Sequence, residues 1–153
     1  MSPYLRFAVM IIVSTVMMYA LMYLNVYAAD HVYLSQTRLF MALIMGAVMA
    51  LVMLAFMRHM YRNRVANGVI VVAALLTFSG ALYLVRSQAT VGDIGWMEAM
   101  IPHHSIAILT SERANLQDPR VRDLADGIIK TQREEISRMK ELIADLHKDQ
   151  GPR

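Results

Sequence analysis

Residues 39–57 read LFMALIMGAVMALVMLAFM and contain no charged or strongly polar side chain. About 20 consecutive apolar residues in a helix are enough to cross the hydrocarbon core of a bilayer. This stretch therefore predicts a transmembrane helix. Two further apolar runs flank it, at residues 4–28 and 65–85, so we expect three spans within a membrane domain of residues 1–86. With 57% hydrophobic residues overall, the chain is too apolar for an ordinary soluble domain.

The charges are divided unevenly between the two halves of the chain. Residues 1–86 hold six Arg and one acid, Asp30, which gives +5; residues 87–153 hold nine Lys or Arg and eleven Asp or Glu, which gives −2 and the total of +3. The positive charge thus belongs to the membrane half and does not indicate a nucleic-acid partner. The loop after the second span has three Arg, whereas residues 30–38 have one Arg and one Asp. The positive-inside rule then places the N-terminus in the cytoplasm and everything after the third span outside, in the periplasm if the membrane is a bacterial inner membrane.

The chain has no cysteine and 14 methionines. Disulfides, thiolate zinc sites and cysteine nucleophiles are therefore excluded. A site for a soft metal would have to be built from Met and His, which suits an oxidising compartment.

After a polar linker at residues 87–92, the sequence predicts two helices at residues 93–147, followed by a tail at residues 148–153. Asp93 is expected to cap the first helix and Pro102 to kink it. Asp118 and Pro119 form a strong start signal for the second helix. Because about two residues join the helices, they must form an antiparallel hairpin. The fold class is therefore all-α, with three transmembrane helices followed by an extramembrane helical hairpin.

The second helix carries an apolar stripe that we expect to be buried. Its members recur every three or four positions: Val121, Leu124, Ile128, Gln132, Glu135, Met139, Leu142 and Leu146. A hairpin this small has little core of its own. We therefore expect two hairpins to pair into a four-helix bundle, as a homodimer or a higher homo-oligomer.

The segment Trp96 to His104, WMEAMIPHH, concentrates soft metal ligands. On a helix, Met97, Met100 and His104 share one face, and His103 lies on the opposite side of Met100 around the helix. Thioether and imidazole together suit Cu(I) first, then Ag(I) or Cu(II). Folding the hairpin about Gln117 brings three residues of the second helix, Gln132, Glu135 and Met139, into the same layer.

Each of these residues also has a plainer interpretation. The methionines alone would serve equally well as core. Glu135 and Gln132 are expected to orient the ligands by hydrogen bonds rather than to bind metal. His31 is on the same expected side of the membrane and is an accessory candidate. The second span carries a stripe of methionines spaced four residues apart. This stripe is a candidate transport path for Cu(I), and it also fits ordinary helix packing; its members are Met41, Met45, Met49, Met53 and Met57.

The motif Met97-x-x-Met100-Ile101-Pro102-His103-His104, with Gln132-x-x-Glu135-Ile136-x-x-Met139 downstream, resembles the bacterial family catalogued as domain of unknown function 305. The resemblance covers roughly residues 93–146. It implies a helical, exported or membrane-tethered protein that binds copper in the periplasm. The ligands that it implies are Met97, Met100, His103, His104 and Met139.

We therefore expect a membrane-anchored periplasmic copper-binding protein for sequestration, resistance or handover of the ion. Membrane lipid surrounds its anchor, and a copper exporter, a chaperone or an oxidase is the kind of partner expected. The sequence shows no Ser–His–Asp arrangement and no open zinc triad, so we expect that the protein is not an enzyme. The alternatives are a copper transport component that uses the methionine stripe and a metal-independent oligomerisation module.

Overall fold

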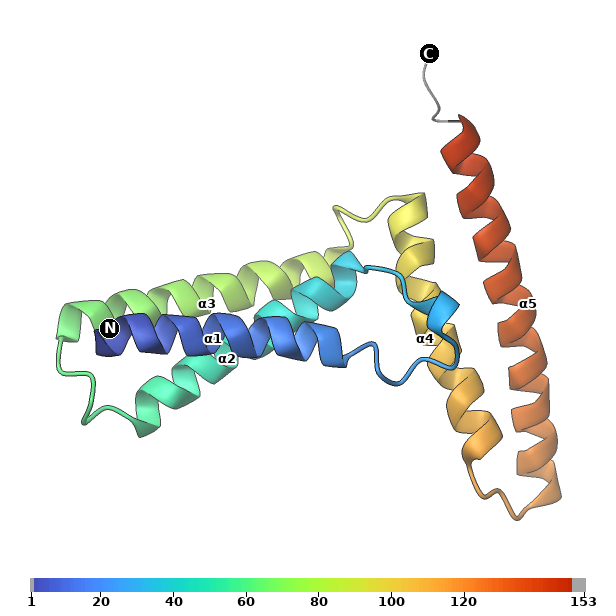
Figure 1. Cartoon of the computed structure of the whole chain (residues 1–153), viewed down its shortest axis with the longest axis horizontal. Helices are drawn as coiled ribbons and strands as arrows, with labels where there is room; N and C mark the ends of the chain where they lie inside the picture. Colours follow the sequence, from blue (N-terminus) through green and yellow to red (C-terminus); the bar gives the residue numbers. More distant parts are fainter. Residues whose placement is uncertain (1, 150–153) are drawn as a thin grey trace. The chain divides into compact units, whose positions relative to one another are not determined.

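A computed structural model describes residues 2–149 of the chain, and within this range all regular secondary structure is helical. The elements in chain order are α1 (Pro3–Leu21), the short 3-10 helix η1 (Ala29–His31), α2 (Gln36–Phe56), α3 (Arg64–Ser87), α4 (Asp93–Arg113) and α5 (Pro119–Asp149) (Figure 1). The expected all-α class, with three long apolar helices followed by further helices, is confirmed. The last four residues of the expected tail, 150–153, lie outside the described residues.

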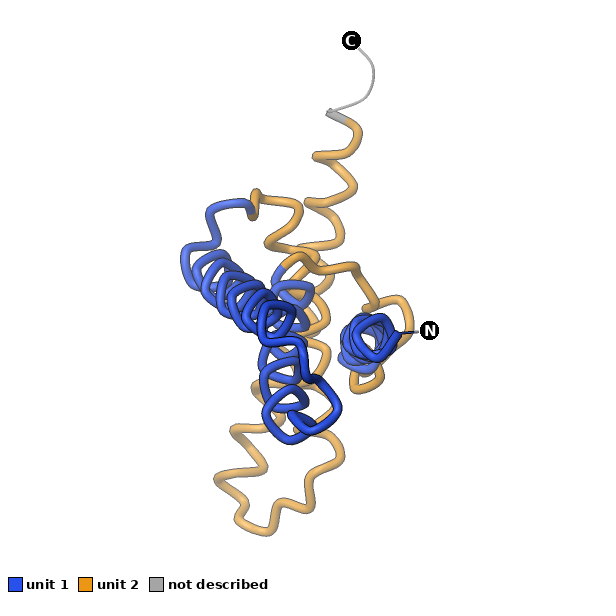
Figure 2. The backbone as a smooth tube through the Cα atoms, turned by 90° about the vertical axis from the view of Figure 1, so that its left-hand side faces the viewer, with its two compact units in different colours: residues 1–22, 37–90 blue, residues 23–36, 91–153 orange. Residues whose placement is uncertain are grey.

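The chain divides into two compact units (Figure 2). The first, which we call the apolar unit, comprises residues 1–22 and 37–90. The second, the hairpin unit, comprises residues 23–36 and 91–153. The segment between the first two spans was expected in the membrane domain, whereas the contacts of residues 23–36 group them with the hairpin.

The helices α1, α2 and α3 are long and apolar enough to cross a membrane. Their ends follow local capping chemistry. Ser2 accepts a hydrogen bond from the backbone N–H of Leu5 at the start of α1. The Asn63 side chain accepts from the N–H groups of Val65 and Ala66 at the start of α3, as an N-cap residue does.

The first helix ends at Leu21, although the apolar run predicted a span that continues to residue 28. A tertiary contact explains the early end. The backbone N–H of Tyr27 donates a hydrogen bond to the Ser105 hydroxyl at 2.6 Å, which a helical amide would instead have given to a carbonyl in the preceding turn. Residues 23–36 therefore do not continue α1 and instead contact α4.

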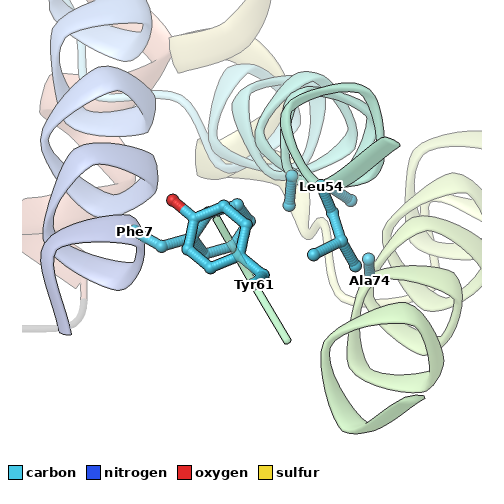
Figure 3. Packing of buried hydrophobic residues seen from close by; sticks show 6 residues of the cluster. Phe7, Leu54, Tyr61 and Ala74 are labelled. Atoms are coloured by element: carbon cyan, nitrogen blue, oxygen red, sulfur yellow. The ribbon is translucent and has the colours of Figure 1, made fainter. Parts of the chain in front are cut away.

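The apolar unit is held together by small residues and one aromatic cluster (Figure 3). Phe7 of α1, Leu54 of α2 and Ala74 of α3 join Tyr61 in a single buried cluster, in which the Phe7 and Tyr61 rings meet edge to face at 5.3 Å. The buried face of α2 is otherwise lined by small residues: Ala42, Gly46, Ala47 and Ala50. Small side chains let helix backbones approach closely, which is how apolar helices pack within lipid.

In the hairpin unit, α4 and α5 run side by side as the expected antiparallel pair (Figure 1). Asp118 accepts a hydrogen bond from the backbone N–H of Arg120 and so caps the start of α5. The core lies between the helices and is built on Ile101 and Ile108, both fully buried, with Ile136 and Ile143 of α5 against them.

The buried face of α5 is not the one that the sequence predicted. Its residues alternate in steps of four and three: Ala125, Ile129, Gln132, Ile136, Met139, Ile143 and Leu146. Five members of the predicted stripe are exposed instead: Val121, Leu124, Ile128, Glu135 and Leu142. Two apolar stripes lie next to each other on α5, and helical periodicity alone does not say which one contacts α4.

Candidate functional site

Three of the predicted thioether ligands lie in one apolar cluster between α4 and α5. Met97 is 5% exposed and Met139 is 6% exposed, and both are members of the cluster that contains Ile101 and Ile136. Met100 is half-buried and packs against the same cluster. This arrangement is what a methionine core requires, and it also gathers the thioethers that a soft metal would bind.

His104 lies at the contact between the two helices, beside the two polar residues that interrupt the α5 stripe. Its Nδ1 atom is 3.0 Å from Oε2 of Glu135, and the two side chains are 14% and 48% exposed. Gln132 donates from its amide nitrogen to the same Glu135 oxygen at 3.2 Å. The predicted register thus brings the three residues into one polar group.

The approach of Glu135 to His104 is close in distance, but it is not aligned for a hydrogen bond. The buried Nδ1 atom of His104 therefore has no hydrogen-bond partner among residues 2–149. A buried imidazole nitrogen without a partner costs free energy, about 1–3 kcal/mol for a neutral group. Such an atom requires an explanation, and one explanation is a ligand supplied from outside the chain.

The charge state of His104 follows from its surroundings. Burial lowers the pKa of its imidazole below the ordinary value of 6.5, and the neighbouring His103 lowers it further, against the opposing effect of Glu135. The lowered pKa favours the neutral form of the ring. A neutral imidazole keeps one nitrogen lone pair free to bind a metal.

His103 points away from the apolar cluster. Its side chain is exposed, and its ring centroid lies 5.9 Å from that of His104 with the planes inclined at 60°. Trp96 is likewise exposed. The structure thus separates the adjacent histidines into one that faces α5 and one that faces solvent.

His31, the predicted accessory ligand, contacts α4 at Ser105. Its Nδ1 atom is 2.9 Å from the Ser105 hydroxyl, which also accepts the N–H of Tyr27. Burial lowers the pKa of His31, and Lys140 lowers it further, while Asp30 acts in the opposite direction. Lys140 in turn donates to the Asp30 carboxylate at 2.6 Å, which lowers the pKa of that carboxyl.

Sequence reasoning missed the importance of Ser105, which is fully buried. It also missed a second attachment of residues 23–36, in which the Arg133 guanidinium pairs with Glu112 and lies 5.7 Å from the centre of the Tyr27 ring. These partners are far apart in the sequence, and Tyr27 and Ser105 have a sequence separation of 78 residues. No local pattern signals such contacts.

The methionine stripe of α2 lies beside, and not on, the buried face of that helix. Met41 is exposed, and Met45 and Met49 are half-buried. Met53 and Met57 pack against the cluster of Phe7 and Tyr61. Within residues 2–149, no group of three or more His, Asp or Glu side chains is close enough together to hold a metal ion.

These features define a class: a two-helix domain whose helices are joined by a short turn, in a chain with three apolar helices long enough to span a membrane. Residues 84–152 match the family described as Domain of unknown function (DUF305), which agrees with the resemblance found in the motif. The chain is also 39% identical over 64 residues to an uncharacterized protein of Acanthamoeba polyphaga mimivirus. That match covers 40% of this chain and 42% of the viral protein, so the chain spans less than half the length of this relative. No solved structure matches the chain.

Proposed function

We propose that the hairpin unit binds copper as Cu(I), and that the three apolar helices anchor it in a membrane. The observation that carries the proposal is the meeting of three thioether side chains, Met97, Met100 and Met139, in one cluster between α4 and α5. On the same pair of helices, burial favours the neutral form of His104, and its buried Nδ1 atom has no hydrogen-bond partner in the described part of the chain.

The chemistry of these donors fits a soft monovalent ion. Thioethers are uncharged and bind Cu(I) or Ag(I) in preference to hard cations, and an ion of charge +1 is less costly to bury than a divalent one. Cu(II) would rely more on the imidazoles. Glu135 and Gln132 would fix the His104 ring, and the exposed His103 would receive the ion from solution or pass it on.

The biological role that fits this site is sequestration, resistance or handover of copper, without catalysis. The three arginines after α2 favour a cytoplasmic N-terminus and a periplasmic hairpin unit in a bacterial inner membrane. A copper exporter, a chaperone or a copper-loaded oxidase would then be the partner that supplies or receives the ion.

The test is a Cu(I) titration of the full chain in detergent against a competing chelator, repeated with Ag(I) and Zn(II). The full chain is needed because residues 23–36 complete the hairpin unit. We expect the double variant Met100→Leu with His104→Ala to lose at least about 100-fold in Cu(I) affinity, since even losing a residue that only orients a ligand costs about 10- to 100-fold. A matched control, Met17→Leu with His59→Ala, makes the same changes at two exposed positions of the apolar unit. Equal affinity of both double variants would refute the proposal.

A second candidate function is that of an oligomerisation module, and the exposed stripe of α5 favours it. Leu124 is 64% exposed, and Val121, Ile128 and Leu142 are exposed on the same helix. A second hairpin packed on this stripe would complete a four-helix bundle. In this case Leu124→Glu should reduce the oligomer to monomers in sedimentation experiments, and the wild type should show no selective Cu(I) binding.

A further inference from the structure

A groove of about 750 Å³ opens between the end of α2 and the start of α3. Its two halves differ in chemistry. The part along the helices is apolar, with Leu54 and Ala55 on one side and Val71 and Val72 on the other. The part at the helix ends is polar and contains Arg58, Arg64 and Asn67.

The arginines of this groove have no counter-charge. Both side chains are exposed, and neither guanidinium makes an ion pair or a hydrogen bond within residues 2–149. The whole apolar unit, residues 1–22 and 37–90, contains no Asp or Glu. The two guanidinium groups are therefore free to bind an anion, and their planar forks match the oxygens of a phosphate group.

The polar end of the groove is built by side-chain hydrogen bonds. The Tyr4 hydroxyl donates to the Asn67 side-chain oxygen at 2.9 Å, and the Asn67 amide donates to the Tyr61 carbonyl at 2.8 Å. Asn63 caps α3 immediately before Arg64. Gly68 lines the groove as well, and a Cβ atom added there would meet nothing within 4 Å.

The position of the groove at the ends of two apolar helices indicates which class of anion it would bind. The helices α2 and α3 are both long and apolar enough to cross a membrane, and Arg58 and Arg64 lie at or just beyond their ends. Residues at the ends of spans lie at the depth of the lipid headgroups. A basic pocket between spans at this depth, continued by an apolar channel, has the same division of chemistry as a phospholipid.

We propose that this groove binds an anionic phospholipid of the surrounding membrane. The phosphodiester contacts Arg58 and Arg64, and the first part of an acyl chain lies against Leu54 and Val72. A zwitterionic lipid fits less well because its ammonium group would bring a positive charge next to two uncompensated guanidiniums. The proposal does not depend on copper binding by the hairpin unit.

The test is native mass spectrometry of the full chain in detergent, titrated with phosphatidylglycerol or with phosphatidylcholine of the same acyl chains. We expect retention of phosphatidylglycerol, and a loss of about 30-fold in its affinity in Arg58→Gln with Arg64→Gln, from the typical contribution of an arginine near anionic lipid. Gly68→Leu keeps both charges, favours the helix and fills the groove, so it should lose lipid as well. Arg62→Gln is the matched control, because it removes a charge from the same loop but does not line the groove.

Three results would overturn the proposal. The first is that Arg62→Gln lowers the affinity for phosphatidylglycerol by as much, per arginine removed, as the double variant does. This would mean that only the overall positive charge of the loop attracts the lipid. Full lipid affinity in Gly68→Leu would mean that the lipid binds elsewhere. Displacement of phosphatidylglycerol by millimolar glycerol phosphate would mean that the arginines bind a free phosphate and that the apolar half of the groove has no part in binding.

Discussion

Replacing Ser105 by alanine should detach residues 23–36 from α4. The hydroxyl of Ser105 is fully buried, accepts the Tyr27 N–H at 2.6 Å and lies 2.9 Å from Nδ1 of His31. Alanine leaves both groups without this partner. A buried polar group that loses its partner costs about 1–3 kcal/mol, so we expect the closed state of the segment to lose about 2 kcal/mol. This corresponds to an increase of about 30-fold in the equilibrium constant for local opening.

Amide hydrogen exchange of the full chain measures this opening directly. We expect the Tyr27 amide to exchange about 30-fold faster in Ser105→Ala than in the wild type. Amides in the middle of α5, such as that of Ile136, should keep their protection, because the core between the helices is unchanged. Ser111→Ala is the matched control, since the Ser111 hydroxyl on the same helix makes no hydrogen bond within residues 2–149.

Unchanged exchange at Tyr27 in Ser105→Ala would refute this reasoning, because it would show that the hydroxyl does not hold the segment. Faster exchange along the whole of α4 and α5 would refute it in a different way. In that case the serine would support the packing of the hairpin itself and not the attachment of residues 23–36.

Two further predictions concern close packing and pH. In Gly46→Ala, the new Cβ would clash with Oγ1 of Thr15, which already donates to the Ile11 carbonyl, so the free energy of unfolding in detergent should fall by about 1–3 kcal/mol. Gly80→Ala meets nothing within 4 Å and should be neutral or slightly stabilising; equal effects of the two changes would contradict the packing. The pKa values of His31 and His104 are lowered by burial, so the unfolded state binds more protons at acid pH. Stability of the hairpin unit should therefore be full above about pH 7 and decline as the pH falls below about 6.5, by at most about 1.4 kcal/mol per pH unit for each proton. Thermal melts followed by circular dichroism measure this decline, and a rise in stability toward acid would contradict it.

Hydropathy and capping were sufficient to predict most of the helices. The second and third spans, expected at residues 39–57 and 65–85, correspond to α2 and α3, and the start of α5 at Pro119 follows from the Asp118 cap. These features depend on neighbours in the sequence, which is why a single sequence reveals them.

The remaining features depend on contacts between distant residues. The early end of α1 and the burial of Ser105 both come from the attachment of residues 23–36 to α4, which no local pattern encodes. The face of α5 was predicted wrongly because Leu124 and Ile129 belong to two apolar stripes of similar strength. The contact of His104 with Glu135 was predictable because an antiparallel hairpin with a short turn fixes its own register. Whether this group binds copper stays a prediction.

The attachment of residues 23–36 also sets an order of events during synthesis. Tyr27 is made 78 residues before its partner Ser105, and translation adds about 5–20 residues per second. The segment therefore waits roughly 4 to 16 s for the helix that it binds. During that interval α2 and α3 are synthesised, so the hairpin unit closes only after the apolar unit is complete. A nascent chain stalled before residue 105 would carry the segment with its polar groups still facing water.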